Sequence, residues 1–468
     1  IKTALEKFDL TPKEKARSTN MFALGLLYWL YGRSMDSSIE FIQNKFATKP
    51  EIVDANIKAL NTGYYYGETL EAIKTTYRVN KATFEKGTYR NIMGNNALAF
   101  GLLAASQRSG LDLYYGGYPI TPASDILHYL AQYKNFGVKT FQAEDEIAGI
   151  TSVIGAAFAG DLAVTATSGP GVALKSEALG LAITTELPLV LVNVQRGGPS
   201  TGLPTKTEQS DLNQAMFGRN GEAPMVVLAP ATPTDCFNIA YESCRIALKY
   251  MIPVILLSDG YIANGSEPWK IPDVDSLPEI ETHITTKKNG FAPFNHDNQN
   301  LARPWGLPGT PGLEHRVGGL EKWDETGHVS YDPENHQKMV ELRQQKVDII
   351  ANDIPKCKIY GKGQGDLLVV GWGGTHGAIR SAVESAQSEG LSISHLHLRY
   401  LNPLPKDLGE ILVKFQKVMI PELNLGQLAM IIRSKFLVDA ISLSKVQGKP
   451  FTQTEVYHKI KELIKDIR

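Results

Sequence analysis

Residues 112–124 read Asp-Leu-Tyr-Tyr-Gly-Gly-Tyr-Pro-Ile-Thr-Pro-Ala-Ser, a strand-like run that leads into two closely spaced prolines. Each proline fixes its own φ at about −65° and disfavours helical backbone in the residue before it, here Tyr118 and Thr121. The pattern therefore predicts a stiff strand-to-helix turn, the proline turn (residues 118–124), which presents the Thr121 hydroxyl at the carboxyl edge of a sheet. Open α/β sheets bind their ligands at this edge.

Three further polar turns each follow a strand-like run. The acid turn (residues 141–149) reads Phe-Gln-Ala-Glu-Asp-Glu-Ile-Ala-Gly, the glycine turn (167–171) reads Thr-Ser-Gly-Pro-Gly, and the arginine turn (195–202) reads Gln-Arg-Gly-Gly-Pro-Ser-Thr-Gly. Strand-like and helix-like runs alternate through this region, which predicts an α/β fold with a parallel sheet covered on both faces. Because parallel strands end at the same edge of a sheet, the four turns predict a single ligand site.

The sequence pattern divides the chain into five segments. Residues 1–80 are predicted to be helical and residues 81–89 to be a polar linker, followed by the main α/β domain at 90–265. Residues 266–360 are predicted to form an extended connecting segment, rich in proline, glycine, asparagine and charge as far as residue 335. Segments of this length without regular structure are usually functional or packed on a partner. Residues 361–468 are predicted to form a second, smaller α/β domain.

The composition excludes several classes of function. The chain has 468 residues, which is too long for one core, and its 48 Lys and Arg balance 49 Asp and Glu. This balance argues against charge-driven binding of nucleic acid or membrane surfaces. The three cysteines are far apart, so we expect no iron–sulfur cluster or structural zinc within this chain. Free thiols and the absence of a long apolar stretch predict a cytoplasmic protein. Because the sequence starts with Ile1, we expect the natural chain to begin earlier.

Taken in order, the motifs resemble those of one family, the α subunits of the 2-oxoacid:ferredoxin oxidoreductases, and specifically the 2-oxoglutarate type. The resemblance covers nearly the whole chain. Residues 17–66 resemble the end of the γ domain that precedes the α domains in this family. Besides the four turns, the resemblance includes Asn91–Asn95, Pro308–His315, Gly318–Glu321 and Pro421–Gln427.

The resemblance implies a fold and an activity. The implied fold is a thiamine-diphosphate pyrimidine-binding-type sheet with a smaller, transketolase C-terminal-like domain and a helical remnant of the γ domain. The implied reaction is oxidative decarboxylation of a 2-oxoacid with CoA, giving an acyl-CoA, CO₂ and reduced ferredoxin. For 2-oxoglutarate the product is succinyl-CoA.

The resemblance also implies a partner β subunit in an (αβ)₂ heteromer, with ferredoxin as the electron acceptor. The β subunit is expected to hold Mg²⁺, the diphosphate half of the cofactor and a [4Fe-4S] cluster. In this chain the nearest approach to the family's Gly-Asp-Gly…Asn metal motif is Ser258–Tyr261, which lacks the first glycine and the asparagine. We therefore predict no metal site here.

Glu144 is the expected catalytic acid of the acid turn. The resemblance implies that its carboxyl group binds N1′ of the aminopyrimidine ring. This contact enables the 4′-nitrogen of the same ring to remove the C2 proton of the cofactor. Asp145 and Glu146 lie outside this register and are assigned to the start of the following helix. The alternative is that all three acids only complement the positive end of that helix.

Thr121 and Arg196 are the residues expected to meet the substrate. The resemblance places Thr121 near the 2-oxoacid, and its alternative role is a helix cap. An arginine followed by two glycines could bind a substrate carboxylate or a CoA phosphate with two parallel hydrogen bonds, and its alternative is a surface salt bridge. Ser200 and Thr201 would add hydroxyl donors.

The remaining candidates are predicted to bind the cofactor or to carry no site. Glycine alone is a weak signal for a phosphate-binding loop. His395 and His397 lie on one face of a predicted strand with no third ligand nearby, so we expect core or interface roles. The expected cofactor-binding residues, besides Glu144, are Tyr118, Pro119, Ser168, Gly169 and Gly171.

Three alternatives to the 2-oxoglutarate enzyme remain open. The first is a related ferredoxin oxidoreductase subunit for pyruvate or a branched-chain 2-oxoacid. The second is a transketolase or E1-type thiamine enzyme subunit, against which the proline turn and residues 266–335 argue. The third is a non-catalytic assembly subunit, against which the retained Glu144, Thr121 and Arg196 argue.

Overall fold

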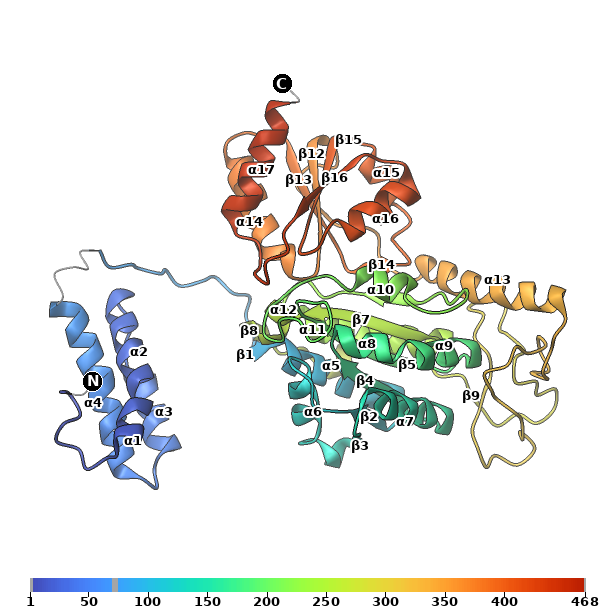
Figure 1. The fold of residues 1–468 in the computed structure, drawn as a ribbon, viewed down its shortest axis with the longest axis horizontal. Helices are drawn as coiled ribbons and strands as arrows, with labels where there is room; N and C mark the ends of the chain where they lie inside the picture. Colours follow the sequence, from blue (N-terminus) through green and yellow to red (C-terminus); the bar gives the residue numbers. More distant parts are fainter. Residues whose placement is uncertain (1–2, 70–74, 467–468) are drawn as a thin grey trace. The chain divides into compact units, whose positions relative to one another are not determined.

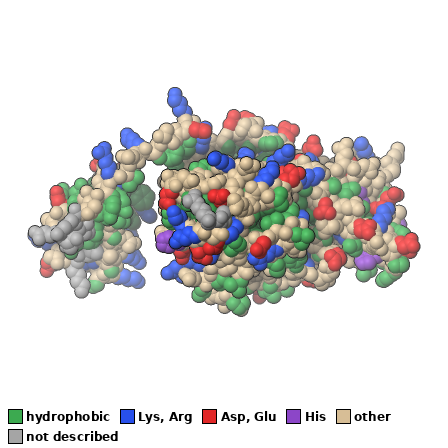
Figure 2. Space-filling view, turned by 90° about the horizontal axis from the view of Figure 1, so that it is seen from above, with side chains coloured by type: hydrophobic (Ala, Val, Ile, Leu, Met, Phe, Trp, Pro, Cys, Tyr) green, Lys and Arg blue, Asp and Glu red, His purple; other side chains and the backbone are tan. Residues whose placement is uncertain are grey.

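The computed structural model describes residues 3–69 and 75–466, which form two compact units, Ile1–Lys86 and Gly87–Arg468 (Figure 1). Residues 1–2 and 70–74, within the predicted helical segment of residues 1–80, lie outside the described residues, as do residues 467–468. Among the described residues, no helix is both long and apolar enough to cross a membrane. On the face shown in Figure 2, positive and negative side chains are interspersed, in keeping with the net charge of −1.

The smaller unit is built from helices whose backbones pack at very short distance. A Cβ added to Gly25 would lie 1.9 Å from the carbonyl oxygen of Leu60, and one added to Gly63 would lie 1.9 Å from that of Phe22. These two glycines therefore allow α2 and α4 to touch backbone to backbone. The helices are α1 (Pro12–Arg17), α2 (Thr19–Leu30), α3 (Asp36–Lys45) and α4 (Pro50–Thr69).

The larger unit contains the predicted parallel sheet. Its seven strands have the order β14-β6-β7-β5-β4-β2-β3, and every pair is parallel except β14 with β6. Every residue of β4, β5 and β7 is buried, as expected for strands covered on both faces. The strands are β2 (Leu113–Gly117), β3 (Val138–Gln142), β4 (Leu162–Thr167), β5 (Leu189–Gln195), β6 (Val226–Leu228), β7 (Pro253–Asp259) and β14 (Tyr400–Asn402).

Helices cover both faces of this sheet. Alternate residues of β4, β5 and β7 pack against α5, α6 and α11 on one face and against α7 and α9 on the other. The α/β fold predicted from the alternating pattern is therefore confirmed. The helices are α5 (Gly94–Ser109), α6 (Ser124–Leu130), α7 (Glu146–Ala159), α8 (Gly169–Leu174), α9 (Ser176–Thr185), α10 (Leu212–Phe217), α11 (Asp235–Tyr250) and α12 (Gly260–Asn264).

A second, five-stranded sheet has the order β11-β13-β12-β15-β16. Helices α14 and α17 lie on one face of it and α15 and α16 on the other (Figure 1). Between β13 and β15 the chain leaves this sheet, and there β14 pairs with β6 of the larger sheet. The strands are β11 (Ile359–Tyr360), β12 (Gly365–Trp372), β13 (Ile393–Leu398), β15 (Phe415–Glu422) and β16 (Ala440–Ser444); the helices are α14 (His376–Ser388), α15 (Leu408–Leu412), α16 (Gln427–Phe436) and α17 (Gln453–Lys465).

The segment between the two sheets is more regular than its sequence predicts. Strand β8 (Ser266–Lys270) pairs antiparallel with β1 (Tyr89–Met93), and α13 spans Pro333–Ile349. The short strands β9 (Ile284–Thr285) and β10 (Trp305–Gly306) also pair. Two of the buried positions of α13 are Arg343 and Lys346, so the helix lacks a continuous apolar stripe and the sequence pattern missed it.

Buried charges hold this segment against the larger sheet. Glu186 follows α9, is 2% exposed, and pairs with the Lys346 ammonium of α13. Its carboxylate also lies 3.0 Å from Nε2 of His296, while Nε of Arg303 donates to the backbone carbonyls of Thr185 and Glu186 at 3.1 and 3.2 Å. Burial alone would raise the pKa of the Glu186 carboxyl, but Lys346 and His296 lower it below its ordinary value.

Candidate active site

The four turns identified in the sequence meet at the carboxyl edge of the larger sheet. The proline turn follows β2, the acid turn continues from the end of β3, and the glycine and arginine turns follow β4 and β5. These strands are neighbours in the order β5-β4-β2-β3 and all run parallel. The sheet therefore brings the predicted site residues to one edge.

The proline and arginine turns are joined by a direct hydrogen bond. Nη1 of Arg196 donates to the backbone carbonyl of Thr121 at 2.6 Å. Arg196 is 6% exposed and forms no ion pair with any residue that the structure describes, so it is not part of a surface salt bridge. Its Nε is buried without a hydrogen-bond partner among the same residues. A buried guanidinium with free donors is suited to bind an anion.

Thr121 does not cap a helix. The N-cap of α6 is Ala123, with no side-chain cap bond, and the hydroxyl of Ser124 closes the turn by contacting the backbone of Ile120. Thr121 is exposed, and its hydroxyl has no hydrogen-bond partner among the described residues. The Thr121–Pro122 and Gly198–Pro199 peptide bonds are cis.

The three acids of the acid turn have different environments. Asp145 is the N-cap of α7, and its Oδ1 accepts a hydrogen bond from the Ala148 amide at 2.8 Å. Glu146 is the first residue of that helix. Glu144 precedes them and is exposed, and its carboxylate has no partner in the described part of the chain. This separation matches the assignment of the last two acids to the helix start and leaves the Glu144 carboxylate available.

Tyr118 lies beneath the turn rather than on its surface. It is 7% exposed, and its hydroxyl is 2.7 Å from Oγ1 of Thr167 at the end of β4. Burial raises the pKa of the phenol above its ordinary value. A Cβ added to Gly171 would lie 1.9 Å from Oγ1 of Thr167 and 2.4 Å from the Tyr118 hydroxyl, so α8 can approach this pair only with glycine there. Pro119, in contrast, is exposed.

A cavity of about 460 Å³ lies beside the glycine and arginine turns. Gly169, Arg196 and Ser200 line it from the larger sheet, and Asn424 and Gln427, which follow β15, line it from the smaller one. Ser168 is fully buried next to this wall, and its hydroxyl has no hydrogen-bond partner among the described residues. Thr201 is exposed on the same loop.

Gln209 fixes the loop after β5 to the smaller sheet. Its amide Nε2 donates to the Trp372 carbonyl at 2.8 Å, and its Oε1 accepts from the Leu423 amide at 3.0 Å. The side chain of Asn424 donates to the Gln209 carbonyl at 2.8 Å. The cavity is therefore built from the carboxyl ends of both sheets, an arrangement that the sequence did not reveal.

Two acids that the sequence analysis did not single out also line this cavity. Burial raises the pKa of both Glu208 and Asp211. Asp211 accepts a hydrogen bond from the side chain of Asn193 at 2.9 Å. Both residues lie in the sequence Thr-Glu-Gln-Ser-Asp at 207–211, a few residues after the arginine turn, and this cluster of polar residues was the signal available.

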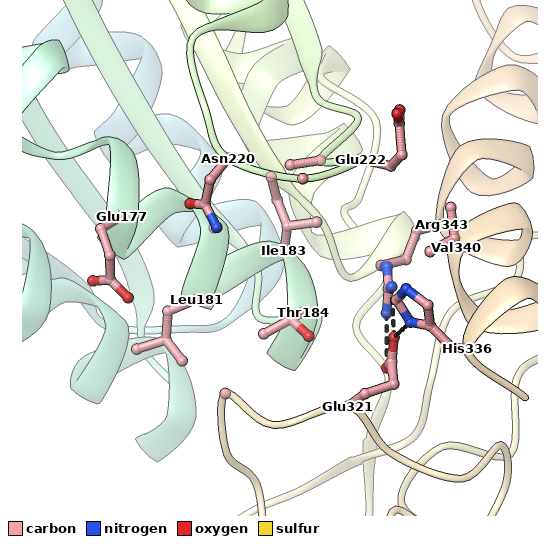
Figure 3. Close-up of a pocket in the computed structure, with 14 residues that line it drawn as sticks. Glu177, Leu181, Ile183, Thr184, Asn220, Glu222, Glu321, His336, Val340 and Arg343 are labelled. Carbon is pink, nitrogen blue, oxygen red and sulfur yellow. Dashed lines mark hydrogen bonds and ion pairs between the residues drawn. The ribbon is translucent and has the colours of Figure 1, made fainter. Parts of the chain in front are cut away.

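A larger cavity, of about 540 Å³, lies elsewhere (Figure 3). It is lined by α9 along its length, by residues around Asn220, by the loop that carries Glu321 and by α13, and α9 leads into the amino-terminal end of β5. Within it, Glu321 accepts hydrogen bonds from Nδ1 of His336 at 2.7 Å and Nη2 of Arg343 at 3.0 Å (Figure 3). None of the predicted site residues line this cavity, so it is not the site formed by the four turns.

The two histidines of β13 pack with a third one. His376, the first residue of α14, has its ring centroid 5.5 Å from that of His395 and 4.9 Å from that of His397. Burial lowers the pKa of His395 to about 3 and that of His397 well below its ordinary value, so both rings are neutral. In the described part of the chain, no group of three His, Cys, Asp or Glu is placed to hold a metal.

Comparison with known proteins identifies the family of this chain. Residues 106–333 match the model of the thiamine-diphosphate-binding domain of pyruvate flavodoxin/ferredoxin oxidoreductases. The 2-oxoglutarate oxidoreductase subunit KorA of Mycobacterium tuberculosis is 55% identical over 454 residues, which cover 97% of this chain and 69% of that protein. This chain belongs to the α subunits of the 2-oxoacid:ferredoxin oxidoreductases.

Other members of the family are similar in sequence and structure. The 2-oxoglutarate synthase subunit KorA of Archaeoglobus fulgidus is 36% identical over 72% of this α subunit and 88% of its own length. The solved 2-oxoglutarate:ferredoxin oxidoreductase of Magnetococcus marinus, with 2-oxoglutarate, coenzyme A and succinyl-CoA bound, superposes with a TM-score of 0.89. That chain is 34% identical, and the match covers 99% of this α subunit and 79% of that chain.

Proposed function

We propose that this chain is the α subunit of a 2-oxoglutarate:ferredoxin oxidoreductase, which converts 2-oxoglutarate and CoA into succinyl-CoA and CO₂ while reducing ferredoxin. The observation that supports it best within the site is the buried guanidinium of Arg196, which has free donors and is held 2.6 Å from the carbonyl of Thr121. The relative that superposes over 99% of this chain has 2-oxoglutarate, coenzyme A and succinyl-CoA bound. We assign Arg196 to a carboxylate of the 2-oxoacid or a phosphate of CoA, with Thr121, Ser200 and Thr201 as hydroxyl donors beside it.

The residues at the turns fit the pyrimidine half of thiamine diphosphate. When bound, this cofactor supplies the nucleophilic carbon that attacks the 2-oxo group. Glu144 offers an exposed carboxylate without a partner in the described residues and would hold a proton at N1′ of the aminopyrimidine ring. Ser168 offers a buried hydroxyl with no partner among those residues, next to Gly169. Tyr118, Pro119 and Gly171 would shape this wall, with Tyr118 and Gly171 acting through packing.

The rest of the reaction is assigned to a partner β subunit. The chain lacks the family's Gly-Asp-Gly…Asn motif, so the β subunit would hold Mg²⁺, the diphosphate half of the cofactor and the [4Fe-4S] cluster. We also assign ferredoxin docking to that subunit, and we propose a cytoplasmic (αβ)₂ assembly. In this assembly residues 1–80 are the end of a γ-type domain and 81–89 a linker; 90–265 form the pyrimidine-binding-type domain, 266–360 connect it, and 361–468 form the second domain.

Co-expression with its β subunit tests the proposal. The purified complex should show visible absorbance from an iron–sulfur cluster and should reduce ferredoxin only when 2-oxoglutarate, CoA and thiamine diphosphate are all present. The isolated chain should be colourless and inactive. Ferredoxin reduction by the isolated chain would contradict the proposal, and a higher kcat/KM for pyruvate or a branched-chain 2-oxoacid would contradict the choice of substrate.

A further inference from the structure

Lys175 is a fully buried lysine without an ion pair. It is the C-cap residue of α8, and its side chain has no carboxylate within salt-bridge distance in the part of the chain that the structure describes. Its Nζ donates to the backbone carbonyl of Glu146 at 2.6 Å and lies 5.2 Å from the centroid of the Tyr118 ring. Burying an ammonium is costly unless its surroundings compensate. The hydrogen bond to Glu146 and the contact with the Tyr118 ring are the compensation that the surroundings of this ammonium provide.

The two contacts of Lys175 connect three of the four turns. Glu146 is the first residue of α7 and belongs to the acid turn, while Tyr118 begins the proline turn. Lys175 itself is the C-cap of the short helix that starts in the glycine turn. A Cβ added to Gly149 would lie 3.4 Å from Nζ, so the glycine leaves room for the ammonium against the first turn of α7.

The backbone around Glu144 is fixed on both sides. Before it, the Ala143 amide donates to the Gly117 carbonyl at 2.7 Å. After it, Asp145 caps α7 by accepting from the Ala148 amide at 2.8 Å. Both contacts come from β2 or from α7 itself, whereas Lys175 adds a contact from α8. Without Lys175, the start of α7 would lose its hydrogen bond to the glycine-turn helix.

We propose that Lys175 is a positioning residue for Glu144. Its ammonium holds the start of α7 against the Tyr118 ring, and this sets where the Glu144 carboxylate projects toward the cofactor. The inference rests on the proposed function, because it gives Glu144 a role at N1′. A displacement of a reacting group by about 1 Å can lower a rate on the order of 10²-fold, so a contact of this kind has a measurable effect on turnover.

The charge on Lys175 should depend on pH in the mildly alkaline range. Burial lowers the pKa of its ammonium to about 8, against the opposing effects of Glu146 and Asp145 on α7. Tyr118 faces it from the proline turn, and Arg196 is the charged group of the arginine turn near that tyrosine. A neutral amine is a weaker donor to the Glu146 carbonyl. Turnover should therefore fall above about pH 8. In the variant Lys175→Arg the side chain stays charged, so the fall in turnover should move to higher pH.

The test compares three variants in the assembled complex with the β subunit. Lys175→Met keeps the length and removes the charge, and Lys175→Arg keeps the charge. Lys139→Met is the control, because Lys139 is a half-exposed lysine of β3 paired with Asp112 and Asp161. Hydrogen–deuterium exchange of peptides spanning residues 141–150 reports on the turn, and kcat, KM for CoA and the pH profile report on function.

Lys175→Met should exchange faster at residues 141–150 and lower kcat by about 10- to 100-fold, with KM for CoA unchanged. Lys139→Met should leave all of these unchanged, and Lys175→Arg should restore most of kcat with an alkaline fall at higher pH. Wild-type exchange and kcat in Lys175→Met would overturn the proposal. If Lys175→Met does not assemble, a wild-type alkaline fall in Lys175→Arg would overturn it equally. A wild-type complex with no thiamine-dependent turnover would refute the proposed function, while the exchange data would still decide whether Lys175 holds the turn.

Discussion

Replacing Glu186 with glutamine should lower the free energy of unfolding of the larger unit by about 3–5 kcal/mol, the range for breaking a buried ion pair from one side. The side chains of Glu186 and Lys346 are 3% and 2% exposed, so glutamine would leave the Lys346 ammonium without a counter-charge. His296, with a side chain 5% exposed, would lose its bond to the same carboxylate. The double variant Glu186→Gln/Lys346→Met removes both charges and should recover much of this loss.

The assay is urea unfolding of the full chain, followed by circular dichroism and tryptophan fluorescence. Glu341→Gln is the matched control, since Glu341 is an exposed acid on α13, the helix that also carries Lys346. Stability of Glu186→Gln equal to that of Glu341→Gln would refute the reasoning. So would a double variant that is less stable than Glu186→Gln, because the two charges would then not be coupled.

The same pair predicts a dependence on acid pH. Lys346 and His296 lower the pKa of Glu186 against the effect of burial, so the folded value lies below the unfolded value of about 4.3. The stabilisation is therefore complete above about pH 4.3 and is lost as the pH falls through the folded pKa. Glu186→Gln should lack this part of the acid sensitivity, and the comparison needs only unfolding midpoints at neutral and acid pH.

Three further predictions concern the site. Glu144→Gln in the assembled complex should slow exchange of the cofactor's C2 proton by about 10² to 10⁴, measured by quenched-flow NMR, whereas Asp145→Asn should leave the exchange rate near wild type; the opposite order would show that the register of the acid turn is wrong. Arg196→Lys keeps the charge but loses the two-donor geometry, so kcat/KM for 2-oxoglutarate or CoA should fall by about 10-fold or more; unchanged values for every substrate would remove Arg196 from the site. Gly171→Ala should weaken thiamine diphosphate binding in a titration, because its Cβ would lie 1.9 Å from Oγ1 of Thr167, and wild-type affinity would show that α8 can shift without effect.

The sequence predicts those features of this fold that depend on local pattern. Strand β4 ends at Thr167, where the strand-like run before the glycine turn was predicted to end, and Asp145 caps α7 as an acid at a helix start commonly does. The convergence of the four turns could also be predicted, since parallel strands end at one edge. These inferences need only neighbours in sequence and one topological rule.

The features that the sequence did not predict depend on contacts between distant residues. Tyr118 is adjacent to the exposed Pro119, and only its bond to Thr167 shows that it lies beneath the turn. Helix α13 was missed because Arg343 and Lys346 take buried positions that are normally apolar, and their partners Glu321 and Glu186 lie far away in sequence. His376 packs on His395 and His397 from a different element, and no local pattern shows that contact.

The bonds of Gln209 make the two sheets of the larger unit mechanically dependent on each other. One amide side chain binds the ends of both β12 and β15 through Trp372 and Leu423, and its loop continues back to Arg196. A hinge rotation of the smaller sheet would therefore pull on the loop that carries Arg196. Because Asn424 and Gln427, which follow β15, also line the cavity, a molecule that fills it would resist that rotation.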